Sequence, residues 1–68
     1  MKVELNGSPV ELREGATVME AVAAASADGG QRGVAVALGG EVVPRGEWET
    51  TPLREGQSVE VVRAIQGG

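Results

Sequence analysis

Apolar and polar residues alternate at the start of the chain, and this pattern predicts a β-hairpin. Val3 and Leu5 share one face of the stretch 2–6. The alternation is repeated at 10–12, after a turn-forming stretch at 6–9 that contains Asn, Gly, Ser and Pro. Alternation with period two, interrupted by residues of this type, is typical of two antiparallel strands.

Helical spacing replaces the alternation in the next segment. Thr17 and Glu20 have the spacing of a capping box, in which the Thr17 hydroxyl accepts from the amide three residues on and the Glu20 carboxylate reaches back. An apolar stripe follows and is expected to face the core: Val18, Ala21, Val22 and Ala25. Asp and two glycines at 28–30 predict the end of the helix.

A second hairpin is predicted after the helix. The run VAVAL at 34–38 has no polar side chain on either face, which is typical of a strand in the middle of a sheet. The two glycines at 39–40 predict a two-residue turn into a short strand at 41–43. Pro44 then ends that strand or marks it as an edge strand.

The segment 45–57 is expected to be irregular, with a turn at its end, before a last strand at 58–65. Trp48 is the only aromatic residue of the chain, and we expect it to close this segment over the core. The resulting order is strand, strand, helix, strand, strand, strand, which predicts an α+β fold.

Alternation fails near the end of the last strand. Val59 and Val61 are expected to point inward, and Arg63, in the same register, to reach the strand's edge or a partner's carboxylate. Near the end of this strand, however, apolar side chains are expected on both faces: Val62, Ala64 and Ile65. Either the strand has a bulge or is covered on both sides, or these residues form an exposed patch that docks on another protein.

Composition narrows the possible chemistry. The 68 residues hold no Cys and no His, which excludes thiolate chemistry and zinc fingers and removes the commonest general base. We therefore predict no catalytic and no metal site, and interpret Glu41, Glu47 and Glu49 as a solvated edge. A net charge of -4 argues against nucleic-acid binding. Without a leader or a long apolar run, a cytoplasmic protein with no membrane contact is expected.

The chain closes on Gln66, Gly67 and Gly68, directly after the last strand. A terminal carboxylate can attack the α-phosphate of ATP, and glycines, which lack a Cβ, can pass through a narrow enzyme channel. We therefore expect a domain at 1–65 and a flexible tail at 66–68 whose reactive group is the carboxylate of Gly68. A terminus without any role is the alternative.

Two segments carry a resemblance to a known family. VAVALGGEVVPRGEW at 34–48 and EGQSVEVVRAIQGG at 55–68 resemble the ThiS family, the sulfur carriers of thiamin thiazole biosynthesis. The likeness runs the length of the chain, and its specific parts are the segment 43–48 and the terminal diglycine. It implies a ubiquitin-like β-grasp fold, with a mixed sheet of about five strands on one main helix and the first and last strands parallel at its centre. The two glycines at 39–40 depart from the family, where Asn is frequent.

The resemblance also implies a protein cosubstrate that is not itself an enzyme. In the family the terminal glycine, here Gly68, is adenylated by an ATP-dependent adenylyltransferase of the ubiquitin-activating type (ThiF-like) and converted to a thiocarboxylate. The sulfur then passes to a thiazole synthase (ThiG-like). Gly67 and Gln66 would support the tail, and no cofactor would be bound. The surface of the last strand would be the docking site: Val62, Arg63, Ala64 and Ile65. A carrier of the molybdopterin type and a non-covalent β-grasp interaction module remain as alternatives.

Overall fold

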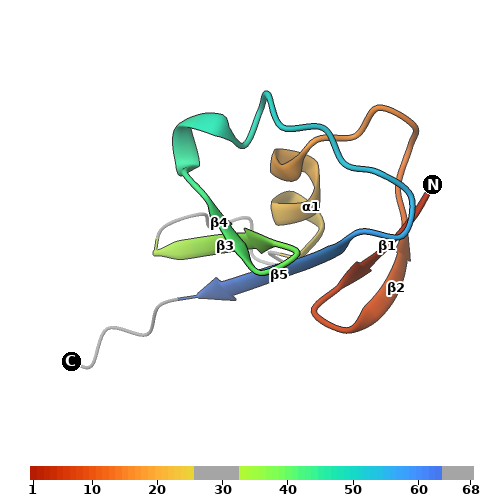
Figure 1. Cartoon of the computed structure of the whole chain (residues 1–68), viewed down its shortest axis with the longest axis horizontal. Helices are drawn as coiled ribbons and strands as arrows, with labels where there is room; N and C mark the ends of the chain where they lie inside the picture. Colours follow the sequence, from red (N-terminus) through yellow and green to blue (C-terminus); the bar gives the residue numbers. More distant parts are fainter. Residues whose placement is uncertain (26–32, 64–68) are drawn as a thin grey trace.

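Strands from both ends of the chain meet in one sheet, and an α-helix packs on one face of that sheet (Figure 1). The computed structural model describes residues 1–25 and 33–63. Within these residues the elements are, in chain order, β1 (Lys2–Leu5), β2 (Ser8–Glu11), α1 (Val18–Ala25), β3 (Val34–Leu38), β4 (Glu41–Val43), the 3-10 helix η1 (Arg45–Glu47) and β5 (Ser58–Arg63). The predicted α+β class is confirmed.

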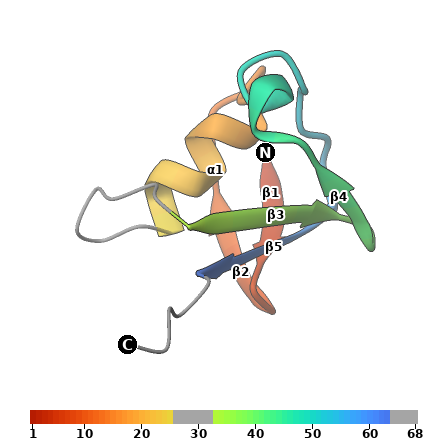
Figure 2. The same ribbon diagram turned by 90° about the vertical axis from the view of Figure 1, so that its left-hand side faces the viewer.

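The strand order of the sheet is β2-β1-β5-β3-β4. β1 and β5 run parallel in its interior, with Leu5 opposite Val59, and the other neighbouring strands are antiparallel. The expected central parallel pair is therefore confirmed. α1 and the segment 44–57 lie on the same side of the sheet, as both views show (Figures 1 and 2). The Met19 amide ties the two together by donating to the Trp48 carbonyl at 3.0 Å.

The turn of the first hairpin is shorter than the sequence predicts. Asn6 and Gly7 alone form it, with φ of 52° and 83°, which is the left-handed geometry of a type I′ turn. The prediction of a turn over 6–9 was wrong, because Pro9 lies in β2 opposite Glu4. The Glu4 amide donates to the Gln57 carbonyl, away from β2, so Glu4 and Pro9 do not exchange main-chain hydrogen bonds. The nitrogen of Pro9 therefore faces the open side of β2, which is an edge strand, and no hydrogen bond of the sheet is lost there.

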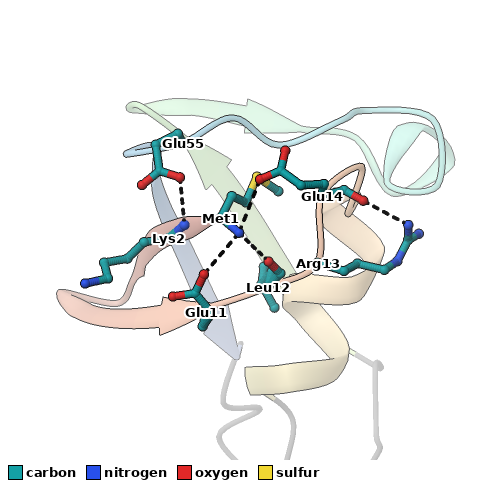
Figure 3. Close-up of polar contacts among 7 residues, drawn as sticks. All are labelled: Met1, Lys2, Glu11, Leu12, Arg13, Glu14 and Glu55. Carbon is teal, nitrogen blue, oxygen red and sulfur yellow. Dashed lines mark hydrogen bonds and ion pairs between the residues drawn. The ribbon is translucent and has the colours of Figure 1, made fainter.

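The first residue is held against the end of β2 by its own amino group (Figure 3). The Met1 ammonium donates to the Leu12 carbonyl at 2.7 Å and lies 3.1 Å from the Glu11 carboxylate and 3.4 Å from that of Glu14. Hydrogen bonding to Glu11, and then to Glu14, raises the pKa of this ammonium because it favours the charged form.

Half of the predicted capping box is present at the start of α1. The Glu20 carboxylate accepts from the Thr17 amide at 3.4 Å, as expected. The Glu20 amide donates to the main-chain carbonyl of Thr17 at 3.0 Å, whereas the prediction had the hydroxyl as acceptor. The Arg13 guanidinium donates two hydrogen bonds to the same carboxylate, from Nε at 2.9 Å and from Nη2 at 2.5 Å. These hydrogen bonds lower the pKa of Glu20 because they favour its charged form. The predicted helix end at 28–30 lies outside the described residues.

Trp48 is the largest of the buried side chains and is 1% exposed. Its indole N–H donates to the Val43 carbonyl at 2.9 Å, and the Arg45 guanidinium lies 5.6 Å from the ring centroid. The core around it is built from the inner faces of α1 and the sheet and from one residue of the segment 44–57: Val3, Leu5, Val18, Ala21, Val22, Val36 and Val59, with Leu53 from that segment. The prediction that Trp48 anchors its segment is confirmed, although the expectation of a wholly irregular 45–57 missed η1.

Candidate functional site

The sheet face opposite α1 is apolar along β3 but stays uncovered in the described part of the chain. Val36 points toward the helix and is 1% exposed. Its neighbours Ala35 and Ala37 therefore face the other way, and Ala35 is exposed while Ala37 is half-buried. The prediction that β3 lies inside the sheet is confirmed. The assumption behind it, that both faces of the strand are buried, was wrong, because Ala35 on the open face is exposed.

Two large apolar side chains border β3 on this open face. Val42 of β4 lies opposite Ala37, and Val62 of β5 lies opposite Ala35. Val42 is 74% exposed and Val62 is 60% exposed. Between them lies a shallow hollow of about 160 Å³, lined by Ala35, Val36, Ala37, Val42, Glu60 and Val62. We call this site the sheet hollow.

β5 reaches the sheet hollow without a break in its pairing. Its register with β3 advances one residue at a time from Val59 to Arg63, so a bulge is excluded over this stretch. Val62 is exposed rather than covered, and Arg63 lies opposite Val34 in the backbone pairing. The other expected docking and tail residues lie outside the described residues: Ala64, Ile65, Gln66, Gly67 and Gly68. The docking role and the reactive terminus stay predictions.

The side chain of Asn6 positions β5, which the sequence did not reveal. Its Oδ1 accepts from the Val61 amide at 2.8 Å, and its Nδ2 donates to the Val61 carbonyl at 3.2 Å. The main-chain N–H of Asn6, the residue after β1, donates to the Val59 carbonyl at 2.9 Å. The carboxamide thus continues the hydrogen-bond ladder by one step beyond β1. In the sequence, the Asn6-Gly7 pair indicates a turn. It does not indicate that the Asn6 side chain bonds to β5, which is more than 50 residues away along the chain.

We expect Asn6→Gly to lower the free energy of unfolding by about 1–2 kcal/mol, because it removes both hydrogen bonds to Val61 and tolerates the positive φ. Urea denaturation followed by circular dichroism measures the loss. Asn6→Asp is the matched variant: it keeps an acceptor for the Val61 amide, but a charged carboxylate oxygen that cannot donate replaces the Nδ2 group beside the Val61 carbonyl. A smaller loss is expected for Asn6→Asp, and an unchanged stability of Asn6→Gly would contradict this role.

Polar clusters do not mark another site in 1–25 or 33–63. In these two ranges no group of three or more acidic side chains is placed to hold a metal ion. The same ranges contain no helix with the length and apolar character needed to cross a membrane. The sheet hollow, and the strand that runs from it toward the C-terminus, are therefore the features on which a functional proposal can be based.

The strand order, the interior parallel pair and the helix on one face define a small ubiquitin-like β-grasp domain. Such domains serve many functions, so the fold alone does not assign one. A family model described as the ThiS family matches residues 3–68, and the chain belongs to this family. Membership supports the role of a small sulfur carrier protein rather than that of a catalyst.

Solved structures agree with this assignment. The chain is 30% identical to the thiamine biosynthesis protein (ThiS) from Geobacter metallireducens in its crystal structure, with a TM-score of 0.80 and 100% of both chains covered. It is 32% identical to a thiamine biosynthesis protein from Geobacter metallireducens solved by NMR, with a TM-score of 0.77, covering 100% of this chain and 88% of that one. A search of curated proteins found no match. The predicted family and fold are confirmed.

Proposed function

We propose that this protein carries sulfur on its C-terminal glycine for thiazole formation in thiamin biosynthesis. The observation that carries the proposal is the family match, which extends to Gly68 and so includes the diglycine end. The two structures of thiamine biosynthesis proteins favour this pathway over a carrier of the molybdopterin type.

The proposed chemistry needs no catalytic side chain from the carrier. An oxygen of the Gly68 carboxylate attacks the α-phosphate of ATP, and pyrophosphate leaves. A sulfur nucleophile at the oxidation level of sulfide then attacks the carbonyl carbon of the acyl-adenylate. A C–S bond forms, the C–O bond to AMP breaks, and AMP leaves with the electron pair, so the step involves no net oxidation. The product is a thiocarboxylate that can pass its sulfur to an acceptor enzyme.

Glycines at the end suit this chemistry for a steric reason. The activating enzyme, an adenylyltransferase of the ubiquitin-activating type, has to take the carboxylate into a nucleotide site through a narrow passage. Residues 65–68, when extended, span about 13–14 Å, and Gly67 and Gly68 bring no Cβ into that passage. We propose ATP as a cosubstrate of that enzyme and a thiazole synthase as the acceptor of sulfur, with a domain at 1–65 and a working tail at 66–68.

Intact mass spectrometry of the protein isolated from its own cells, grown without thiamin, tests the proposal. We expect a fraction of the chains to be heavier by the difference between one sulfur and one oxygen atom, with the change localised to Gly68 by fragmentation. A variant that lacks Gly68 is the control and should show no such species. Only the unmodified mass in the wild type would contradict the proposed function.

A further inference from the structure

We propose that Asn6 is a positioning residue for the adenylation of Gly68: its side chain holds the end of β5 in the sheet, so that the tail leaves the domain in one direction. This inference rests on the proposed function, and it adds the internal contact that presents the tail to the activating enzyme. Asn6 lies near the start of the chain, but the strand that it contacts is the one that leads to Gly68.

β5 is longer than its neighbour β1. The pairing with β1 ends where Leu5 lies opposite Val59, whereas β5 continues to Arg63. Figure 1 shows β5 running on past the hairpin of β1 and β2. On its other side, β5 stays paired with β3 as far as Arg63. Beyond Val59, the side of β5 that faces β1 therefore needs a partner other than a neighbouring strand.

Asn6 supplies hydrogen-bond partners for both main-chain groups of Val61 on that side. The Val61 N–H donates to Oδ1 at 2.8 Å, and the Val61 carbonyl accepts from Nδ2 at 3.2 Å. Because both groups point toward Asn6, Val61 and Val36 of β3 form a non-hydrogen-bonded pair of the antiparallel ladder. β3 therefore offers the Val61 main chain no replacement when the Asn6 side chain is removed.

Asparagine at this position does more than the turn requires. Asn6 has φ of 52°, the one positive φ of a residue other than glycine within 1–25 and 33–63. A two-residue turn of this type accepts Asn, Asp or Gly at its first position. Of these three, only asparagine carries a donor and an acceptor in its side chain at neutral pH. The turn alone does not explain the carboxamide, whereas the contact with β5 uses both of its polar groups.

A small change of direction at Val61 is amplified at the reactive carboxylate. Gly68 lies seven residues beyond Val61, so the chain between them, when extended, is about 23–25 Å long. Over that length, a tilt of about 10° moves the far end by about 4 Å. If the end of β5 leaves the sheet, only a fraction of the chains presents the tail in the direction that fits the enzyme. The apparent KM then rises in proportion as that fraction falls.

The experiment is steady-state adenylation of the full chain, measured as ATP–pyrophosphate exchange with the purified ThiF-like adenylyltransferase of the same organism. We expect Asn6→Gly to raise the KM for the carrier about five- to tenfold and to leave kcat near the wild-type value. Val10→Ala is the control for stability, because it removes core contacts from β2, which does not neighbour β5. At a temperature at which both variants are folded, Val10→Ala should keep the wild-type KM.

Hydrogen exchange of the free carrier measures the contact itself. In Asn6→Gly the Val61 amide should exchange about tenfold faster than in the wild type, because its acceptor is lost. The amide of Val22 in α1 should change no more than it does in Val10→Ala. An unchanged rate at Val61 would overturn the proposal, since the end of β5 would then be held without Asn6.

An engineered disulfide separates positioning from a direct contact between Asn6 and the enzyme. The Cα atoms of a non-hydrogen-bonded pair such as Val36 and Val61 are about 4.5 Å apart, within the range of a disulfide. The chain has no Cys, so Val36→Cys with Val61→Cys allows a single bridge within the chain. Added to Asn6→Gly, the oxidised bridge should restore the KM of the same cysteine pair with Asn6 in place. Reduction with a phosphine should raise the KM again.

The outcomes separate this inference from the proposed function. If the wild-type chain is not adenylated, the proposed function fails and the inference fails with it. If the wild type is adenylated and Asn6→Gly keeps its KM, only the positioning role of Asn6 is overturned. A raised KM that the oxidised bridge does not lower would also overturn this role, because Asn6 would then contact the enzyme directly.

Discussion

Adding a single alanine after Gly68 is expected to lower kcat/KM for ATP-dependent adenylation by about 100-fold or more. The extra residue moves the carboxylate by about 3.3–3.6 Å along an extended chain and adds a methyl group next to it. A reacting oxygen displaced by this much no longer lies in line with the α-phosphate. The exchange of pyrophosphate into ATP, catalysed by the ThiF-like adenylyltransferase, measures the effect.

Two controls make this result specific. Gly68→Ala keeps the chain length and tests the effect of the methyl group alone, so it should lose less activity than the extended chain. The melting temperature of the extended chain should equal that of the wild type, because the added alanine lies six positions beyond Arg63, the last residue of β5. Undiminished adenylation of the extended chain would contradict the requirement for a carboxylate at Gly68, whereas a wild-type chain that is not adenylated at all would favour a non-covalent interaction module.

We expect Trp48→Ala to lower the free energy of unfolding by about 3–5 kcal/mol, the range for deletion of a large buried aromatic side chain. The indole is 1% exposed and reaches into the core from a segment that has little regular structure of its own. A core in a domain of 68 residues supplies only about 3–5 kcal/mol in total. The variant should therefore be largely unfolded at room temperature, as judged by circular dichroism and urea denaturation.

Trp48→Phe is the matched variant for this prediction. It retains most of the apolar ring and loses the indole N–H that donates to the Val43 carbonyl at 2.9 Å. A loss of about 1–2 kcal/mol is expected, because the carbonyl of the half-buried Val43 is left without this donor. Cooperative unfolding of Trp48→Ala at the wild-type urea concentration would show that the ring is not the anchor of its segment.

Local signals in the sequence were sufficient for most elements of the fold. Glycines at 39–40 have φ of 54° and 91°, as a two-residue hairpin turn requires, and Pro44 directly follows β4 at the sheet edge. The parallel pairing of β1 with β5 joins segments more than 50 residues apart. Periodicity does not encode such a pairing, and only the resemblance to the ThiS family predicted it.

The candidate site was predictable only in part. The failure of alternation around Val62 left open a bulge, a strand covered on both sides or an exposed apolar patch, and the exposure of Val62 fits the last of these. The contribution of Val42 depends on the antiparallel register that places it opposite Ala37, and the contribution of Glu60 depends on the register between β3 and β5. These registers are fixed by tertiary packing, so the sequence alone could not assemble the sheet hollow.

The contacts of the first residue decide how the protein can be produced for these measurements. An affinity tag fused ahead of Met1 turns its ammonium into a neutral amide with one N–H, which cannot serve Leu12, Glu11 and Glu14 together. A tag after Gly68 would block the proposed reactive carboxylate. Purification should therefore use a cleavable N-terminal fusion whose removal restores the free amine of Met1.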